Sequence, residues 1–362
     1  MSNACACSGG GGGGGGGGCG GGSEGGEVEA KNPKTRLRNS TYEETKRAAL
    51  EASRPGGAPQ CYRCPAVGKC NPRGGEVLCW ECLGTQLTRN FRNQMTRARA
   101  SAPSERLLVA FSGGARSIAL AHLFRRSVGE LRGRQFHVEM AFVDDTGIFQ
   151  EHGLAADAAR NLVSQVESVG SGFGFALTTL QMPDCSKRDL AAGLAKIAAQ
   201  SADGNMCSVT EWEDDRAHLR MDVLLQFAQQ KGFTRVVIAD SATTVAARVV
   251  AHATKGKHLN SSDLSHRENV QGFVALKSVL RPLNDIIDEE LFLLVRSTGA
   301  QPVAGPLGVV NNSAMWQRMS LNVHSRRLVA ILQRDKKGSV HTILRTIFKL
   351  EESKSTTGTG EK

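Results

Sequence analysis

Four cysteines in the first third of the sequence have the spacing of metal ligands. They form two CxxC pairs with fourteen residues between the pairs: Cys61, Cys64, Cys79 and Cys82. Four thiolates in two such pairs are the usual ligands of a structural zinc ion with tetrahedral geometry. A redox-active CxxC motif fits less well, because two pairs are present and no strand–helix–strand unit precedes them. We therefore predict a zinc-ribbon-like module, and we leave Cys70, between the pairs, outside the ligand set.

A second group of residues has the composition of an anion-binding turn. The apolar run at 107–111 has the length of a buried strand, and it ends at Ser112, Gly113 and Gly114, where a helical pattern begins. A strand, a glycine turn and a helix leave backbone N–H groups at a helix N-terminus, where phosphates bind. We predict that this turn, with the hydroxyls of Ser112 and Ser117, binds a phosphate group. An ordinary tight turn is the alternative.

Two later segments place polar residues at the ends of expected strands. Residues 137–143 form a strand candidate followed by Asp144, and residues 235–239 form another, followed by a hydroxyl-rich turn at 240–244. In a doubly wound sheet the carboxyl ends of the strands border the ligand crevice. Asp144 is therefore expected to reach a ribose hydroxyl or a cation of the bound nucleotide. A simple Asp-x-x-Gly turn explains the same residues.

The elements that position these residues predict the fold class. Strands alternate with helices in the middle of the chain, which is typical of an α/β protein with a doubly wound parallel sheet. An apolar stripe after Ser339 is expected to pack on its own domain, with a dimer interface as the alternative. From composition we expect five segments: a disordered Gly-rich and basic tail (1–58), the cysteine module with a basic connector (59–100), the α/β domain (101–300), a helical segment (301–350) and a disordered tail (351–362).

The overall composition favours a partner that carries negative charge. The formal net charge is +10, which is consistent with binding to nucleic acid. Hydrophobic residues make up 40% of the chain, enough for a core in its middle part, and no apolar run is long enough to predict a membrane span. The N-terminus does not have the layout of a secretory signal, so the ten cysteines are expected to be reduced thiols.

The Ser-Gly-Gly-x-x-Ser turn resembles the pyrophosphate loop of the PP-loop ATP pyrophosphatases, with their adenine nucleotide α-hydrolase-like fold. Active members usually have Lys and Asp at the two inner positions, where this chain has Ala115 and Arg116. Further pieces are the ADSATTVAARVVA segment, the SVLRPLNDI segment and residues 328–350. Their order after the paired cysteines is similar to that of the cytoplasmic tRNA 2-thiolation protein 2 family.

This resemblance implies a non-catalytic or weakly catalytic subunit of a cytoplasmic tRNA sulfurtransferase. It implies a role in 2-thiolation of the wobble uridine of tRNA, as a heterodimer with the catalytic thiolation protein 1. The implied sulfur donor is a thiocarboxylated ubiquitin-related modifier, and the retained loop implies ATP as a ligand. Cys185 and Cys207 lack the family's Cys-Gly pattern, and the turn at 240–243 lacks paired acids for Mg²⁺. The reactive thiols are therefore expected from the partner.

Two other interpretations stay open from the residues. One is an autonomous ATP pyrophosphatase that modifies RNA with its own loop. The other is a zinc-ribbon RNA-binding adaptor that binds no nucleotide. Members of the family extend into a further cysteine-bearing segment, so the resemblance also implies a protein longer than this sequence.

Overall fold

The computed structural model describes residues 59–73, 75–100, 105–130, 137–152, 154–199, 206–256, 267–268, 278–305 and 320–357. All of them belong to one structural unit, Pro55–Lys362. The N-terminal tail predicted at 1–58 lies outside these residues, as does the end of the chain after 357. None of the helices described has the length and apolar character needed to cross a membrane.

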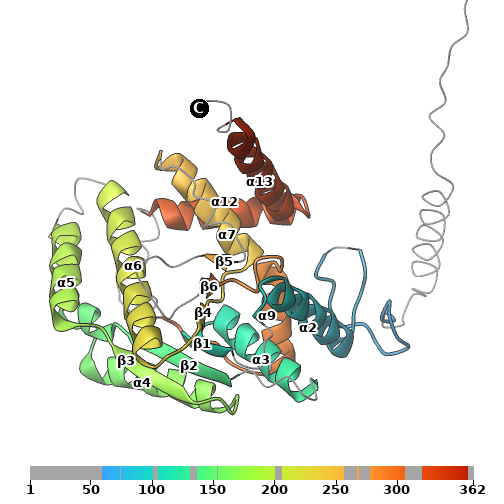
Figure 1. The fold of residues 1–362 in the computed structure, drawn as a ribbon, viewed down its shortest axis with the longest axis horizontal. Helices are drawn as coiled ribbons and strands as arrows, with labels where there is room; N and C mark the ends of the chain where they lie inside the picture. Colours follow the sequence, from blue (N-terminus) through green and yellow to red (C-terminus); the bar gives the residue numbers. More distant parts are fainter. Residues whose placement is uncertain are drawn as a thin grey trace, which may run out of the picture. The chain divides into compact units, whose positions relative to one another are not determined.

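A six-stranded sheet forms the centre of the described chain (Figure 1). In spatial order the strands are β3 (Leu177–Gln181), β2 (His137–Asp144), β1 (Arg106–Ala110), β4 (Arg235–Val237), β6 (Ser278–Leu280) and β5 (Arg267–Glu268). All pair in parallel except the two-residue edge strand β5. The order reverses between β1 and β4, which is where ligands bind in doubly wound sheets. The predicted fold class is confirmed.

The apolar sequence of β1 follows from its central position in the sheet. Leu107, Leu108 and Val109 are fully buried, because a central parallel strand is covered on both faces and needs a continuous apolar run. Val109 pairs with Met140 of β2 and with Val237 of β4. These three strands are in register, so the loops that follow β1 and β4 start at the same edge of the sheet.

Helices cover both faces of the sheet (Figure 1). Leu107 and Val109 share a core with helices α3 (Ala115–Glu130), α4 (Ala156–Ser171) and α9 (Asp288–Thr298), whereas Leu108 packs with α6 (Met206–Gln230) on the other face. This alternation follows from the twofold period of a strand. Helix η1 (Thr146–His152), helix α5 (Asp184–Ala199) and the start of α6 form a smaller core around Phe149 and Trp212.

Three further helices pack together beyond the sheet. They are α7 (Ala242–Thr254), α12 (Leu321–Asp335) and α13 (Ser339–Thr357). Val340, Leu344 and Ile347 of α13 are buried in a core with Val245 of α7 and Val329 of α12, so the stripe predicted after Ser339 packs on its own chain. Helix α13 continues to Thr357, past the boundary that composition placed at 350.

The cysteine segment is joined to the sheet domain by a continuous core. Leu83, Leu87 and Phe91 of α2 (Trp80–Arg97) are fully buried, and the ring of Phe91 meets the ring of Phe124 in α3 at a centroid distance of 4.9 Å. Met95, one turn after Phe91, is also buried. The helix predicted as a connector is therefore part of the domain's hydrophobic core.

Candidate functional site

The structure brings the four predicted metal ligands together. The Sγ atoms of Cys61, Cys64, Cys79 and Cys82 all lie within 4.8 Å of one another, and Cys64 Sγ is 3.6 Å from the Sγ atoms of Cys79 and Cys82. Thiolates about 2.3 Å from one zinc ion in a tetrahedron are about 3.8 Å apart. The cluster thus fits one metal ion, whereas a cluster of several irons and sulfides needs its thiolates farther apart.

Each cysteine pair is positioned by a local backbone turn. In the first pair, the N–H of Cys61 donates to the carbonyl of Ala66 at 2.8 Å. In the second, Cys79 is the N-cap of α2, and its Sγ accepts from the N–H of Cys82 at 3.4 Å. The positive end of a helix favours thiolates. The sequence therefore places its second pair at the positive end of a helix.

Hydrogen bonds from the backbone favour the ionised form of one thiol in this cluster, that of Cys61. Burial raises the pKa of Cys61, but hydrogen bonds with the backbone of Arg63, Cys79 and Cys64 outweigh it and lower the pKa to about 6. Burial and the neighbouring thiols instead raise the pKa of Cys82 to about 12. A bound cation would relieve the repulsion that keeps further thiols protonated.

Cys70 lies outside the four-cysteine cluster. Its buried Sγ donates to the carbonyl of Leu78 at 3.4 Å, and the two residues form an antiparallel bridge. Burial and the sulfurs of Cys79 and Cys61 raise the pKa of Cys70. This thiol stabilises the turn that carries the second cysteine pair.

The predicted phosphate turn forms between β1 and α3. Gly113 has a φ angle of +70°, a conformation that glycine adopts without strain. A Cβ atom there would lie 3.0 Å from Val166 Cγ2 and 3.2 Å from Val303 Cβ, and the carbonyl of Gly113 accepts from the N–H of Val303 at 2.9 Å. Helix α3 begins at Ala115, so the N–H groups of its first turn have no acceptor within the helix.

Hydrogen bonds of the two predicted serines, Ser112 and Ser117, connect the start and the end of the turn. Ser117 Oγ donates to the carbonyl of Gly114 at 2.9 Å and accepts from the N–H of Ser112 at 3.3 Å. Ser112 Oγ is exposed and lies 3.3 Å from Ser117 Oγ. The buried Ser117 thus holds the turn closed, and Ser112 is the hydroxyl better placed to meet a ligand.

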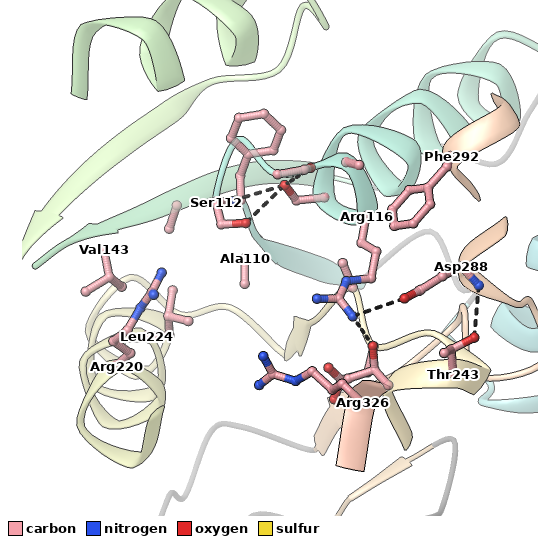
Figure 2. Close-up of a pocket in the computed structure, with 18 of the residues that line it drawn as sticks. Ala110, Ser112, Arg116, Val143, Arg220, Leu224, Thr243, Asp288, Phe292 and Arg326 are labelled. Atoms are coloured by element: carbon pink, nitrogen blue, oxygen red, sulfur yellow. Dashed lines mark hydrogen bonds and ion pairs between the residues drawn. The ribbon is translucent and has the colours of Figure 1, made fainter. Parts of the chain in front are cut away.

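A cavity of about 560 Å³ opens beside this turn (Figure 2). It lies at the carboxyl ends of β1 and β4, where the strand order reverses. Asp240, Thr243 and Thr244 line it, so the hydroxyl-rich turn predicted at 240–244 does face the same cavity as Ser112. Four arginines from three helices also line it: Arg116 of α3, Arg220 of α6, and Arg326 and Arg327 of α12. We call this cavity the arginine pocket.

Arg116 links three elements across the arginine pocket. Its guanidinium donates to Thr244 Oγ1 of α7 and lies 3.7 Å from Asp288 Oδ2 at the start of α9. Figure 2 shows its side chain extending from α3 toward Asp288, with Arg326 on the adjoining wall. Asp288 in turn accepts from Ser241 Oγ and donates its N–H to Thr243 Oγ1 at 3.1 Å. The inner position of the loop thus carries a positive group that is held in place.

The acidic side chains of the arginine pocket are already paired. Asp240 Oδ2 is 2.8 Å from Arg248 Nη2 and 3.2 Å from Arg281 Nε. Burial raises the pKa of Asp240, but these guanidinium groups outweigh it and lower the pKa. The lining carries four arginines, one of which, Arg220, also lies 3.7 Å from Asp145 Oδ2, against the two acidic residues Asp240 and Asp288. Its net charge is therefore positive. Such a pocket favours phosphate groups.

Asp144 is not among the described residues that line the arginine pocket, and its contact with a ribose hydroxyl or a cation stays a prediction. Its Oδ1 accepts from the N–H and the hydroxyl of Thr146 at 2.9 Å and 2.7 Å, and its Oδ2 accepts from Gln181 Nε2 at 3.0 Å. A carboxylate that bonds to the backbone two residues onward forms an Asx turn. The structure favours the turn interpretation of this motif.

Sequence reasoning missed the arginines of α6 and α12. Arg220, Arg326 and Arg327 lie more than a hundred residues beyond the glycine turn, and no local motif connects them with it. The available signal was the adjacent pair Arg326 and Arg327 in an amphipathic helix. Cys185, considered as a sulfur-handling residue, is exposed on α5 and does not line the pocket.

The parallel sheet with a Ser-Gly-Gly turn at its switch point defines an α/β protein of the PP-loop class. The U34-tRNA thiolase NcsA from Methanococcus maripaludis, solved with its [4Fe-4S] cluster, superimposes with a TM-score of 0.58 over 81% of this chain and 87% of that chain, at 15% identity. That likeness shows the fold.

In sequence, the chain is similar to two proteins named cytoplasmic tRNA 2-thiolation protein 2. The one from Dictyostelium discoideum is 24% identical over 280 residues, which are 76% of this chain and 52% of the relative. The one from Arabidopsis thaliana is 26% identical over 287 residues, 75% of this chain and 59% of the relative. No family model matches. The predicted resemblance to this family is confirmed, and the chain spans between half and three fifths of the length of these relatives.

Proposed function

We propose that this chain is a non-catalytic subunit of a cytoplasmic tRNA 2-thiolation complex. The observation that carries the proposal is the arginine pocket, in which the glycine turn is kept while the groups around it are paired with one another. Arg116 bonds to Thr244 and Asp288, and Asp240 bonds to Arg248 and Arg281. No cysteine is among the described residues that line the pocket. The site is suited to holding phosphate rather than to transferring sulfur.

The proposed complex is a heterodimer with the catalytic thiolation protein 1. In this arrangement the chain contributes to tRNA binding, and the paralogue contributes the reactive thiols. The modified base is the wobble uridine, and the sulfur comes from a thiocarboxylated ubiquitin-related modifier. The names of the relatives and the formal net charge of +10 support this function.

We also propose that the four-cysteine cluster holds a structural zinc ion. Cys61, Cys64, Cys79 and Cys82 supply four sulfur ligands at the spacing of one tetrahedral ion. With four protein ligands no coordination position is left for a substrate. The ion's contribution is to hold the two cysteine turns and the start of α2 together, so that its binding energy stabilises the fold.

ATP is the nucleotide that we propose for the arginine pocket. Arg326 and Arg327 of α12 and the N-terminus of α3 supply positive charge for its phosphates. The carboxylates of Asp240 and Asp288 face guanidinium groups, so they are poor ligands for the Mg²⁺ that phosphoryl chemistry requires. The pocket is therefore expected to bind ATP with little or no turnover.

The function is tested by purifying this chain alone, the candidate paralogue alone, and the two together. Each preparation is incubated with unmodified tRNA, ATP and a sulfur donor, and thiouridine is measured after nuclease digestion. We expect thiouridine from the pair and none from this chain alone. Thiouridine, or pyrophosphate released from ATP, by this chain alone would contradict the proposal and favour an autonomous ATP pyrophosphatase.

A further inference from the structure

A second polar cavity, of about 710 Å³, lies between the cysteine-bearing helix and the sheet domain. We call it the tryptophan pocket. It is formed by the start of α2, the middle of α3 and the ends of α4 and α9, and none of its described lining residues also lines the arginine pocket. Figure 1 shows α2, α3 and α9 beside one another. We propose that the tryptophan pocket binds a single-stranded segment of RNA; this inference rests on the proposed tRNA function.

Two arginines of α3 give the tryptophan pocket its positive charge. Arg125 is exposed and donates to the carbonyl of Gly172 at 3.2 Å, which leaves donors of its guanidinium for a phosphate. Arg126 donates to Glu81 Oε1 at 2.7 Å, but that carboxylate is 74% exposed, so water weakens its pairing. The pocket keeps a positive net charge, because two arginines face one exposed carboxylate.

The position of Arg126 depends on a glycine in the facing helix. A Cβ atom on Gly84 would lie 3.0 Å from Arg126 Nη1 and 3.3 Å from its Cζ. Because Gly84 has no side chain, the guanidinium packs directly against α2. Arg126 is thereby held at a fixed place in the wall of the pocket.

Two aromatic side chains provide surfaces for nucleobases. Trp80 and Phe173 line the pocket, and both are partly buried at the edge of the main hydrophobic core. Trp80 directly follows Cys79, so the cysteine cluster fixes its backbone. Single-stranded RNA is recognised by stacking of unpaired bases on such rings, together with arginine contacts to the backbone.

The remaining lining supplies neutral hydrogen-bonding groups. Ser168 and Gln301 line the pocket, and the hydroxyls of Ser297 and Thr298, which donate to the carbonyls of Leu294 and Val295, present oxygen acceptors. Burial and the nearby charges of Arg126 and Arg125 lower the pKa of His122, so its imidazole is neutral at pH 7 and offers one donor and one acceptor. Cationic, neutral polar and aromatic groups in one cavity match a base and its phosphate better than they match an apolar peptide.

The proposal is tested by the affinity of the full chain for unmodified tRNA and for a short single-stranded RNA. Fluorescence anisotropy is measured over a series of salt concentrations for Trp80→Ala, Trp80→Phe and Arg125→Gln. The matched control is Arg160→Gln, because Arg160 is 72% exposed on α4 and pairs only locally with Asp157 among the contacts described.

We expect Trp80→Ala to weaken binding at least fivefold, whereas Trp80→Phe, which keeps an aromatic face, stays within about threefold of the parent. Arg125→Gln is expected to reduce the slope of log affinity against log salt by about 0.7, the contribution of one single-strand phosphate contact. Arg160→Gln is expected to change neither quantity.

Parent-like affinity of Trp80→Ala together with a parent-like salt slope of Arg125→Gln would overturn the tryptophan pocket as an RNA site. If Trp80→Ala fails to fold, the salt slope of Arg125→Gln decides. The proposed function is judged separately: it is retained if the parent chain binds tRNA and supports thiolation with its partner, even when the variants show that the tryptophan pocket is not an RNA site. A parent chain that binds neither RNA would overturn both proposals.

Discussion

At the scale of single residues, the glycines of the phosphate turn are not equivalent. Gly113 has a φ angle of +70° and is closely packed against Val166 and Val303, whereas a Cβ on Gly114 would meet only Ser112 Oγ, at 3.5 Å. Both look alike in the sequence. Only Gly113 has a backbone conformation and a packing that require glycine. Gly114 has room for a methyl group.

This difference predicts opposite outcomes for two matched substitutions. Gly113→Ala is expected to lower the free energy of unfolding by about 1–3 kcal/mol, because an alanine there is strained and meets two valines. Gly114→Ala is expected to change it by less than about 1 kcal/mol. Urea unfolding followed by circular dichroism measures both. Equal stabilities of the two variants would contradict the packing described for the turn.

The basic residues around the cysteines also differ in their roles. Arg63 and Lys69 are exposed, but Arg73 Nε lies 2.8 Å from Glu290 Oε1 in α9, and that carboxylate is fully buried. From its position between the cysteine pairs, Arg73 would be expected to contribute surface charge. Its main effect is instead to neutralise a buried acid, because removing one partner of such a pair leaves an uncompensated charge.

At the scale of elements, α12 connects the arginine pocket with a polar network. Its N-cap Ser320 donates to Glu213 of α6. Lys255, at the end of α7, lies 2.7 Å from Asp214 Oδ2 and donates to Asn322 Oδ1 at 2.9 Å. The Lys255 side chain is 8% exposed. This network fixes the start of α12, and with it the arginines one turn further along.

We therefore predict that Lys255→Met weakens anion binding at a distance. Loss of this ammonium removes a largely buried ion pair with Asp214, which is expected to cost up to about 3 kcal/mol of folding stability and to loosen α12. Calorimetric titration with ATP is expected to show severalfold weaker binding. The control is Lys337→Met, whose exposed pair with Glu289 contributes less than about 1 kcal/mol. ATP affinity equal to that of the parent would show that α12 does not depend on this network.

At the scale of the whole molecule, the cysteine segment and the sheet domain share one core. Metal removal is therefore predicted to destabilise the domain as well as the cysteine turns. Treatment with a zinc chelator, or Cys79→Ser, is expected to reduce bound metal well below one equivalent and to lower the melting temperature of the main transition. Cys185→Ser, on the exposed face of α5, is the control. An unchanged melting temperature after complete metal loss would show that the stability of the sheet domain does not depend on the metal-bound cysteine segment.

The sequence predicted those parts of the molecule that are specified locally. The buried run of β1, the turn at Gly113 and the two cysteine pairs each have a short-range signature, and each forms as expected. Arg326, Arg220 and Trp80 enter their pockets through packing of helices that are distant in sequence, which periodicity does not reveal. At Asp144 a local motif exists but is ambiguous, because the same residues fit a ligand contact and a turn. The hydrogen bonds of Asp144 with Thr146 are visible only in the structure.

Helix α3 borders both pockets, with its first turn at one and Arg125 at the other. An α-helix rises 1.5 Å per residue, so the eight residues from Ser117 to Arg125 correspond to about 12 Å along its axis. The helix thus fixes the distance between the two proposed ligand sites. A one-residue insertion between Ser117 and Arg125 would rotate the far contacts by about 100° relative to the near ones, so the register of this one buried helix sets how the two pockets face each other.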